Sequence, residues 1–166
     1  MKFLVPIDVR GCADAVIERA LWLARAVPGA RLDLMTVVPA LGVVHGASAL
    51  TVGERTHALG AALDEETAAL LRGFAVLVDR SGVLGDVVAS HGPAADSILT
   101  ACAARRPEMV IMGSHARTGL ARAVFGSVAE QVLRGAGCPV LIVPAGRGLP
   151  ERMADVELQA DAESAG

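Results

Sequence analysis

Two short segments of the sequence carry residues suited to binding an anion or a sugar. Asp8 follows an apolar run of strand length, and a carboxylate at a strand tip accepts hydrogen bonds from hydroxyl or amine groups. Gly113 follows a second apolar run, and Gly126 and Ser127 precede a helical pattern. A loop that closes on a helix N-terminus presents free backbone N–H groups and partial positive charge. The two segments therefore indicate an anion-binding site.

Each segment also has an explanation that needs no ligand. Asp8 suits the cap of a following helix, where its carboxylate would accept an orphan N–H. Ser127 and Glu130 have the S-x-x-E spacing of a capping box. His115, inside the second segment, either touches a bound group or is solvated. The residues by themselves leave these alternatives open.

The sequence contains no pattern that predicts efficient catalysis, because no nucleophile is paired with a general base. Cys12 could start a C-x5-R phosphatase loop, but Glu18 occupies the arginine position. Cys12, Cys102 and Cys138 are widely spaced, with neither a CxxC nor a Cys/His pair at zinc spacing, so we expect no disulfide or metal site. Lys2 is the only lysine, which excludes a Walker A loop and a Schiff-base enzyme.

Composition excludes two further classes of partner. The net charge is −3 and aromatic residues make up 2%, so the chain lacks both the basic footprint and the stacking platforms of nucleic-acid binding. The longest uncharged stretch, residues 34–53, contains proline, glycines and polar residues, which argues against a membrane span. The N-terminal apolar run is too short for a signal peptide. We therefore expect a cytoplasmic protein without a membrane partner.

Alternating apolar runs and amphipathic stretches predict the elements that position the two segments. The expected strands are Lys2 to Ile7, Leu32 to Val38, Val83 to Ala89, Met109 to Met112 and Pro139 to Val143. The expected helices are Cys12 to Ala26, Glu54 to Arg72 (ended by Gly73), Ala94 to Arg105 and Gly126 to Gly135. Phe74 to Val78 is also strand-like, and we favour Val83 to Ala89 over it. The fold class is thus α/β: an open five-stranded parallel sheet, Rossmann-like, with strand order 3-2-1-4-5 and helices on both faces.

Chain length indicates one domain. A chain of 166 residues with 53% hydrophobic residues supplies a single core. Residues 145–166 contain two arginines and five acidic residues with little periodicity. We expect residues 1–144 to form one α/β domain, followed by an acidic and mobile tail.

The late loop resembles a known family. Gly113 and Gly126-Ser127, flanked by Met-Val-Ile-Met and Cys-Pro-Val-Leu-Ile-Val, are similar to the universal stress protein family, whose nucleotide-binding branch carries G-x2-G-x9-G-[ST] there. The resemblance extends to Leu-Val-Pro-Ile-Asp at residues 4–8 and Gly-Pro-Ala at residues 92–94, spans residues 2–144 and is weakest over 40–80. One position departs, since Ala116 stands where the motif has its second glycine. If that backbone requires positive φ, the strain is about 1 kcal/mol or somewhat more.

The resemblance implies a site for ATP, with Mg²⁺ arriving alongside the nucleotide because no carboxylate cluster suggests a dedicated metal cage. The adenine and ribose contacts that it implies are Pro6, Asp8 and Val37. The phosphate contacts that it implies are Met112, Gly113, Ser114, His115, Ala116, Arg117, Gly126, Ser127 and Val128.

The resemblance also implies a homodimer, in which the strand Val140 to Val143 pairs with its copy and so covers an aggregation-prone edge. The function that we expect is an ATP-binding regulatory module that acts as a dimer in stress response, through an unidentified protein partner and with little or no catalysis. Two alternatives remain: a nucleotide-free stress or scaffold protein of the same fold, with Ala116 marking the loss, and a slow ATPase.

Overall fold

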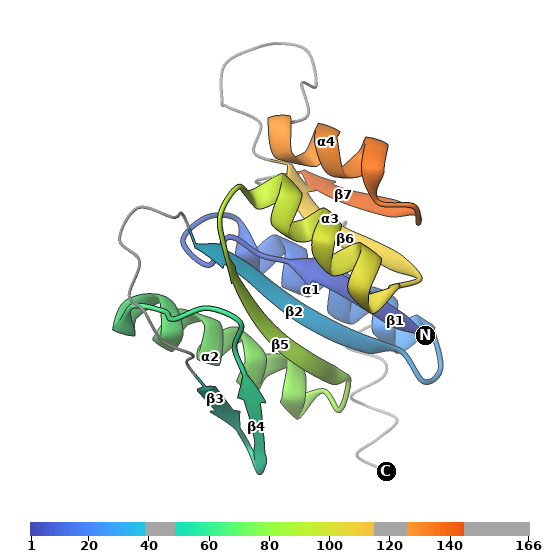
Figure 1. Ribbon diagram of the computed structural model, residues 1–166. Helices are drawn as coiled ribbons and strands as arrows, with labels where there is room; N and C mark the ends of the chain where they lie inside the picture. Colours follow the sequence, from blue (N-terminus) through green and yellow to red (C-terminus); the bar gives the residue numbers. More distant parts are fainter. Residues whose placement is uncertain (39–48, 115–125, 145–166) are drawn as a thin grey trace.

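The computed structural model describes residues 1–38, 49–114 and 126–144, which form a central parallel sheet with helices on both faces (Figure 1). The strands are β1 Lys2–Pro6, β2 Arg31–Val38, β3 Ala49–Val52, β4 Arg55–Ala58, β5 Leu84–His91, β6 Met109–Ser114 and β7 Val140–Pro144. The helices are α1 Ala13–Ala26, α2 Glu65–Arg80, α3 Ala94–Arg105 and α4 Ser127–Gly135.

The sheet has the order β5-β2-β1-β6-β7, and its four pairings are parallel. Counted in chain order, its five strands follow the expected 3-2-1-4-5, so the predicted α/β class is confirmed. Numbered over all seven strands the order differs, because two short strands, β3 and β4, precede β5 in the chain and form a separate antiparallel pair.

Each strand of the sheet centre is buried on both faces, which is why its sequence is continuously apolar. Phe3 and Val5 pack into the cluster beneath α1 and α2, whereas Leu4 packs into the cluster beneath α3 and α4. Side chains alternate between faces along a strand, so one five-residue strand supplies both cores. Full burial of a side chain such as Leu4 stabilises the fold by about 1.5–3 kcal/mol.

The structure corrects the region between β2 and β5. The expected helix from Glu54 to Arg72 is wrong, since β4 occupies its start and α2 runs to Arg80. The true start is Asp64, whose Oδ1 accepts the Thr67 N–H at 2.9 Å and so caps the helix. Gly73 does not end α2, because a glycine inside a helix lowers stability without forbidding the helix. The strand-like run 74–78 is likewise helical.

The hairpin β3–β4 was not predicted from the sequence. Leu50 and Val52 alternate inward from β3 onto the main core, and Gly53 turns the chain with φ +57°. His57 from β4 is 8% exposed, and its Nδ1 accepts the Val87 N–H of β5 at 3.2 Å. The hairpin therefore covers the face of β5 beside α2 (Figure 1).

None of the helices in the described part of the chain combines the length and apolar character that crossing a lipid bilayer requires.

Candidate functional site

The carboxyl ends of β1 and β6 lie side by side and form the switch point of the sheet, where consecutive crossovers leave in opposite directions. Pro6 ends β1, and Ser114 ends β6. Val37 lies near the carboxyl end of β2, which pairs with β1 on its other side. Three distant parts of the chain thus reach one edge of the sheet.

The structure places most of the predicted site residues at or next to this edge, with different exposures. Those with little exposed surface are Pro6, Met112 and Ser114; those that are partly exposed are Val37, Gly113, Gly126 and Val128; and those that are exposed are Asp8 and Ser127. His115, Ala116 and Arg117 lie outside the described residues. Side-chain contacts from Pro6 and Met112 are therefore limited, and Asp8 and Ser127 present the accessible polar groups.

Asp8 does not cap the following helix. Its Oδ1 accepts the Arg10 N–H at 3.1 Å, and its carbonyl accepts the Gly11 N–H at 2.9 Å, so residues 8–11 form a tight turn beyond β1. The N-cap of α1 is Cys12, without a side-chain cap hydrogen bond. The turn fixes the Asp8 carboxylate at the exposed tip of the strand.

Ser127 does not form the capping box that its spacing to Glu130 suggests. Gly126 is the N-cap of α4 and Ser127 is the first helical residue, so the hydroxyl is one position too late to cap. Glu130 instead pairs with Arg134, one turn further on, at 3.0 Å. Because no side chain caps α4, the N–H groups of its first turn are left for water or for an anion.

Gly113 is a glycine for a reason that its sequence position does not reveal. A Cβ built on it would lie 2.7 Å from the Cys12 Sγ and 3.3 Å from the Val16 Cγ2, so α1 occupies the space of the missing side chain. We expected this glycine to admit a ligand; the structure gives it a packing role. Burial raises the pKa of the Cys12 thiol, and the negative charge of Asp8 adds to that shift. The sulfur is therefore held as a thiol.

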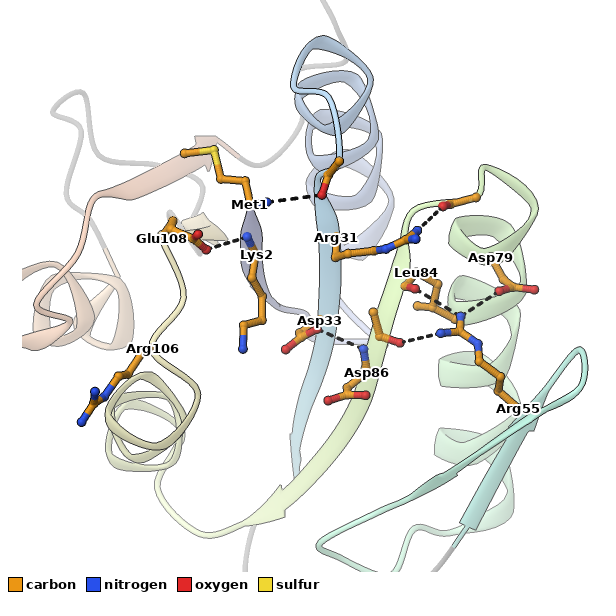
Figure 2. A pocket seen from close by; sticks show the side chains of 13 residues that line it. Met1, Lys2, Arg31, Asp33, Arg55, Asp79, Leu84, Asp86, Arg106 and Glu108 are labelled. Atoms are coloured by element: carbon orange, nitrogen blue, oxygen red, sulfur yellow. Dashed lines mark hydrogen bonds and ion pairs between the residues drawn. The ribbon is translucent and has the colours of Figure 1, made fainter.

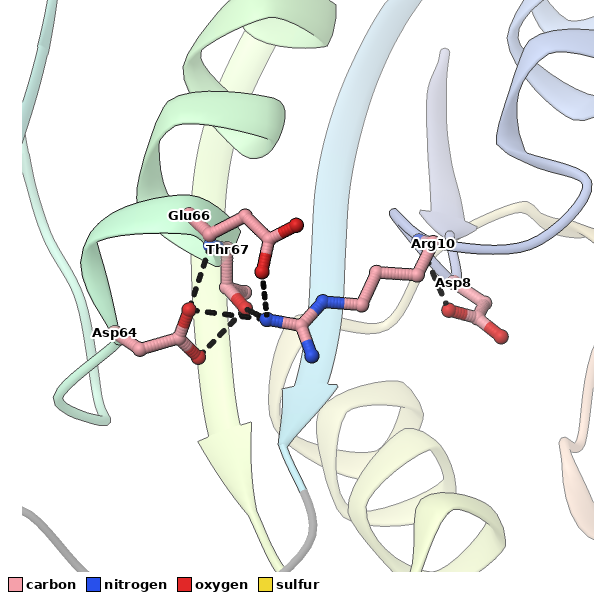
Figure 3. A network of polar contacts seen from close by, with 5 residues as sticks. All are labelled: Asp8, Arg10, Asp64, Glu66 and Thr67. Atoms are coloured by element: carbon pink, nitrogen blue, oxygen red, sulfur yellow. Dashed lines mark hydrogen bonds and ion pairs between the residues drawn. The ribbon is translucent and has the colours of Figure 1, made fainter.

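Arg10 joins the turn beyond β1 to the start of α2, an interaction that the sequence did not reveal (Figure 3). Its Nη2 lies 3.1 Å from the Asp64 Oδ1, 3.0 Å from the Glu66 Oε2 and 3.1 Å from the Thr67 Oγ1. The N–H and hydroxyl of Thr67, and then Arg10, lower the pKa of the Asp64 carboxyl. We call these four residues the Arg10 network. It ties the segment carrying Asp8 to a second helix.

Metal-ligating groups are sparse in this part of the molecule. Across residues 1–38, 49–114 and 126–144, the structure gathers no group of three or more histidine, cysteine or acidic side chains that would hold a metal ion. The three cysteines are free thiols, and burial, together with the neighbouring Cys138, raises the pKa of Cys102 to about 11.

The site lies in a region of the chain that has known relatives. A family model described as the universal stress protein family matches residues 1–144. The chain belongs to the universal stress protein family.

Individual relatives agree with this assignment. Universal stress protein MJ0531 of Methanocaldococcus jannaschii is 33% identical over 81 residues, which cover 49% of this chain and 48% of that protein. The match thus spans about half the length of this curated universal stress protein.

Among solved structures, a universal stress protein in complex with cAMP has a TM-score of 0.62 at 18% identity, covering 88% of this chain and 98% of that one. A universal stress protein family member from Burkholderia pseudomallei has a TM-score of 0.60 at 25% identity, covering 87% and 96%. One from Archaeoglobus fulgidus has a TM-score of 0.62 at 20% identity, covering 86% and 98%. Universal stress proteins thus share the fold described above.

Proposed function

We propose that residues 1–144 form a regulatory module that binds ATP at the switch point between β1 and β6 and acts in the cytoplasm as part of a stress response. The observation that carries this proposal is the pairing of an exposed carboxylate, Asp8, with the uncapped N-terminus of α4 at Gly126 and Ser127. A carboxylate suits ribose hydroxyls or the adenine amine, and an uncapped helix start suits a phosphate chain. The complex of a related universal stress protein with cAMP supports a nucleotide ligand.

The roles follow from the exposure of each group. The exposed Asp8 holds the sugar or base, and Ser127 with the N–H groups that follow it holds the phosphates. Mg²⁺ enters on the nucleotide and is held mainly by the phosphates. The function is binding coupled to a protein partner, with at most slow hydrolysis.

A homodimer completes the proposal. β7 is an edge strand of the sheet, and Val140, Leu141 and Ile142 are each only partly buried. Leu133 on the adjacent α4 is 47% exposed. Pairing β7 with its copy satisfies the open edge and covers these apolar groups. Sedimentation velocity tests this: the full chain runs as a dimer, and Leu141→Arg shifts it to a monomer.

Calorimetric titration with ATP, ADP, AMP and cAMP tests nucleotide binding. Two variants disturb the site: Ser127→Ala removes a hydroxyl, and Gly126→Asp places a negative charge where the phosphates bind. We expect ATP to bind the wild type, Ser127→Ala to bind about tenfold more weakly through loss of a charge-assisted hydrogen bond, and Gly126→Asp to lose binding. Arg72→Ala, on the exposed face of α2, is the matched control and binds as the wild type does.

Two results would decide against this function. If no nucleotide binds the wild type, and mass spectrometry finds none released from the heated purified protein, the chain is a nucleotide-free protein of the same fold, as Ala116 suggests. If ADP accumulates with ATP faster than with Gly126→Asp and at a steady rate, the chain is an ATPase.

A further inference from the structure

A second hollow opens at the amino edge of the sheet, at the opposite end of the strands from Asp8 (Figure 2). Its volume is about 680 Å³. It is formed by the first residues of β1, β2 and β5, by the turns before β2 and β5, and by the segment after α3. We call it the amino-edge hollow.

Two of its carboxylates are engaged by one arginine. Arg105 of α3 lies 3.1 Å from the Asp33 Oδ2 and 2.9 Å from the Asp86 Oδ2. The Asp33 side chain is 4% exposed, and its other oxygen accepts the Asp86 N–H at 3.0 Å. Gly85 is required here, because a Cβ on it would lie 2.2 Å from the Asp33 Oδ1. These acids form the floor of the hollow and are already paired.

The other two carboxylates are also engaged. Arg55 of the hairpin lies 3.0 Å from the Asp79 Oδ1 and donates to the Leu84 carbonyl at 3.1 Å. Glu108 accepts the Lys2 backbone N–H at 2.6 Å, which is the main reason that the pKa of Glu108 is lowered. Each acidic group of the hollow thus has a donor.

Three cationic side chains of the hollow lack such a partner. In the described part of the chain, no ion pair joins Lys2, Arg31 or Arg106 to a carboxylate. Arg31 donates only to the neutral carbonyl of Gly82. The three come from the start of β1, the start of β2 and the residue after α3, so they surround the hollow from separate elements (Figure 2).

We propose that the amino-edge hollow binds a compact polyanion carrying two or more phosphate or carboxylate groups. A guanidinium presents a planar fork to either group, whereas the Lys2 ammonium is a point charge. Cations on separate elements require more than one anionic group to be engaged together. The chain as a whole carries a net charge of −3, so the attraction is local to this edge.

The proposal does not depend on nucleotide binding at the carboxyl edge. The two places lie at opposite ends of the sheet, so both are filled at once. An anion here contacts the starts of β1 and β2, whereas the nucleotide proposed above contacts their ends.

The composition of the chain provides a reporter, since Lys2 is the only lysine. Reductive methylation with ¹³C-formaldehyde keeps the ammonium charge and gives one lysine signal, resolved from that of the α-amino group. The full chain is titrated with tripolyphosphate, with citrate as the carboxylate arm, and with chloride at matched ionic strength. We expect a saturable shift of the lysine signal with at least one of the two polyanions, and none with chloride.

Variants locate the site. Arg106→Gln and Arg31→Gln each remove one cation and are expected to weaken binding about tenfold or more, the value of a charge-assisted hydrogen bond. Arg72→Gln makes the same charge change on α2 and is expected to leave affinity within about twofold, because salt screens distant charges. Each variant is first checked for a wild-type amide spectrum.

Three outcomes overturn the proposal: no saturable shift with either polyanion, equal weakening by Arg72→Gln, or loss of the lysine response in Gly126→Asp. The first two mean surface screening only, and the third means that the anion acts from the nucleotide site. A wild type that binds no ATP but gives the saturable lysine shift refutes the nucleotide function and leaves this inference standing.

Discussion

Replacing Gly113 by alanine places a methyl group 2.7 Å from the Cys12 sulfur, about 1 Å inside the optimum for non-bonded contact. β6 lies between β1 and β7 and α1 packs against it, so neither element yields easily. Overpacking of this kind costs about 1–3 kcal/mol, and we expect a value near 2 kcal/mol. For a chain of this size, that loss lowers Tm by about 4–8 °C.

Cys12→Ala supplies the decisive comparison. On its own it removes a half-buried sulfur and costs about 1 kcal/mol or less. Combined with Gly113→Ala, it removes the clash, so the double variant is expected to be more stable than Gly113→Ala by about 1 kcal/mol. Urea unfolding of the four proteins measures this coupling. Equal stability of Gly113→Ala and the double variant would refute the reasoning.

The same double variant separates packing from ligand binding. If Gly113 serves only to seat α1, the double variant binds ATP as the wild type does. If the backbone must also approach a phosphate, affinity falls although stability has been restored.

Further predictions concern three other positions. Gly85→Ala forces the buried Asp33 carboxylate out of its ion pair and is expected to cost about 3 kcal/mol, measured by urea unfolding; a loss below about 1 kcal/mol would mean that Asp33 relocates freely. Since the pKa of Asp64 is lowered in the folded chain, its capping contribution is complete above about pH 4 and is lost as pH falls through the lowered value. Asp64→Asn should therefore flatten the acid limb of a Tm-against-pH curve, and an unchanged limb would assign that limb to other carboxyls. Cys102, with a pKa of about 11, should resist iodoacetamide at pH 8 until urea unfolds the chain, as peptide mass spectrometry will determine, and rapid labelling in the native state would contradict its burial.

The sheet was predictable because its strands are buried on both faces and so read as unbroken apolar runs. The same signal misled where α2 lies, since residues 74–78 are equally apolar but form part of a helix. The deciding signal was Asp64 with Glu65 and Glu66, an acidic start that suits the positive end of a helix. Gly73 concealed it by resembling a helix stop.

The edge that carries the candidate site followed from the order of strands, but its internal contacts did not. Arg10 and Asp64 are 54 positions apart, so their ion pair depends on how two crossovers lie in space. The clash that fixes Gly113 likewise crosses from β6 to α1. Contacts of this kind leave no local pattern in a sequence.

The Arg10 network limits how pieces of this fold are exchanged. A chimera that takes residues 59–80 from another family member brings a new helix start to face Arg10. Unless the graft supplies acceptors in place of Asp64, Glu66 and Thr67, the guanidinium is released beside the strand tip. The first crossover and the second helix therefore behave as one unit of inheritance, although the hairpin and two strands separate them along the chain.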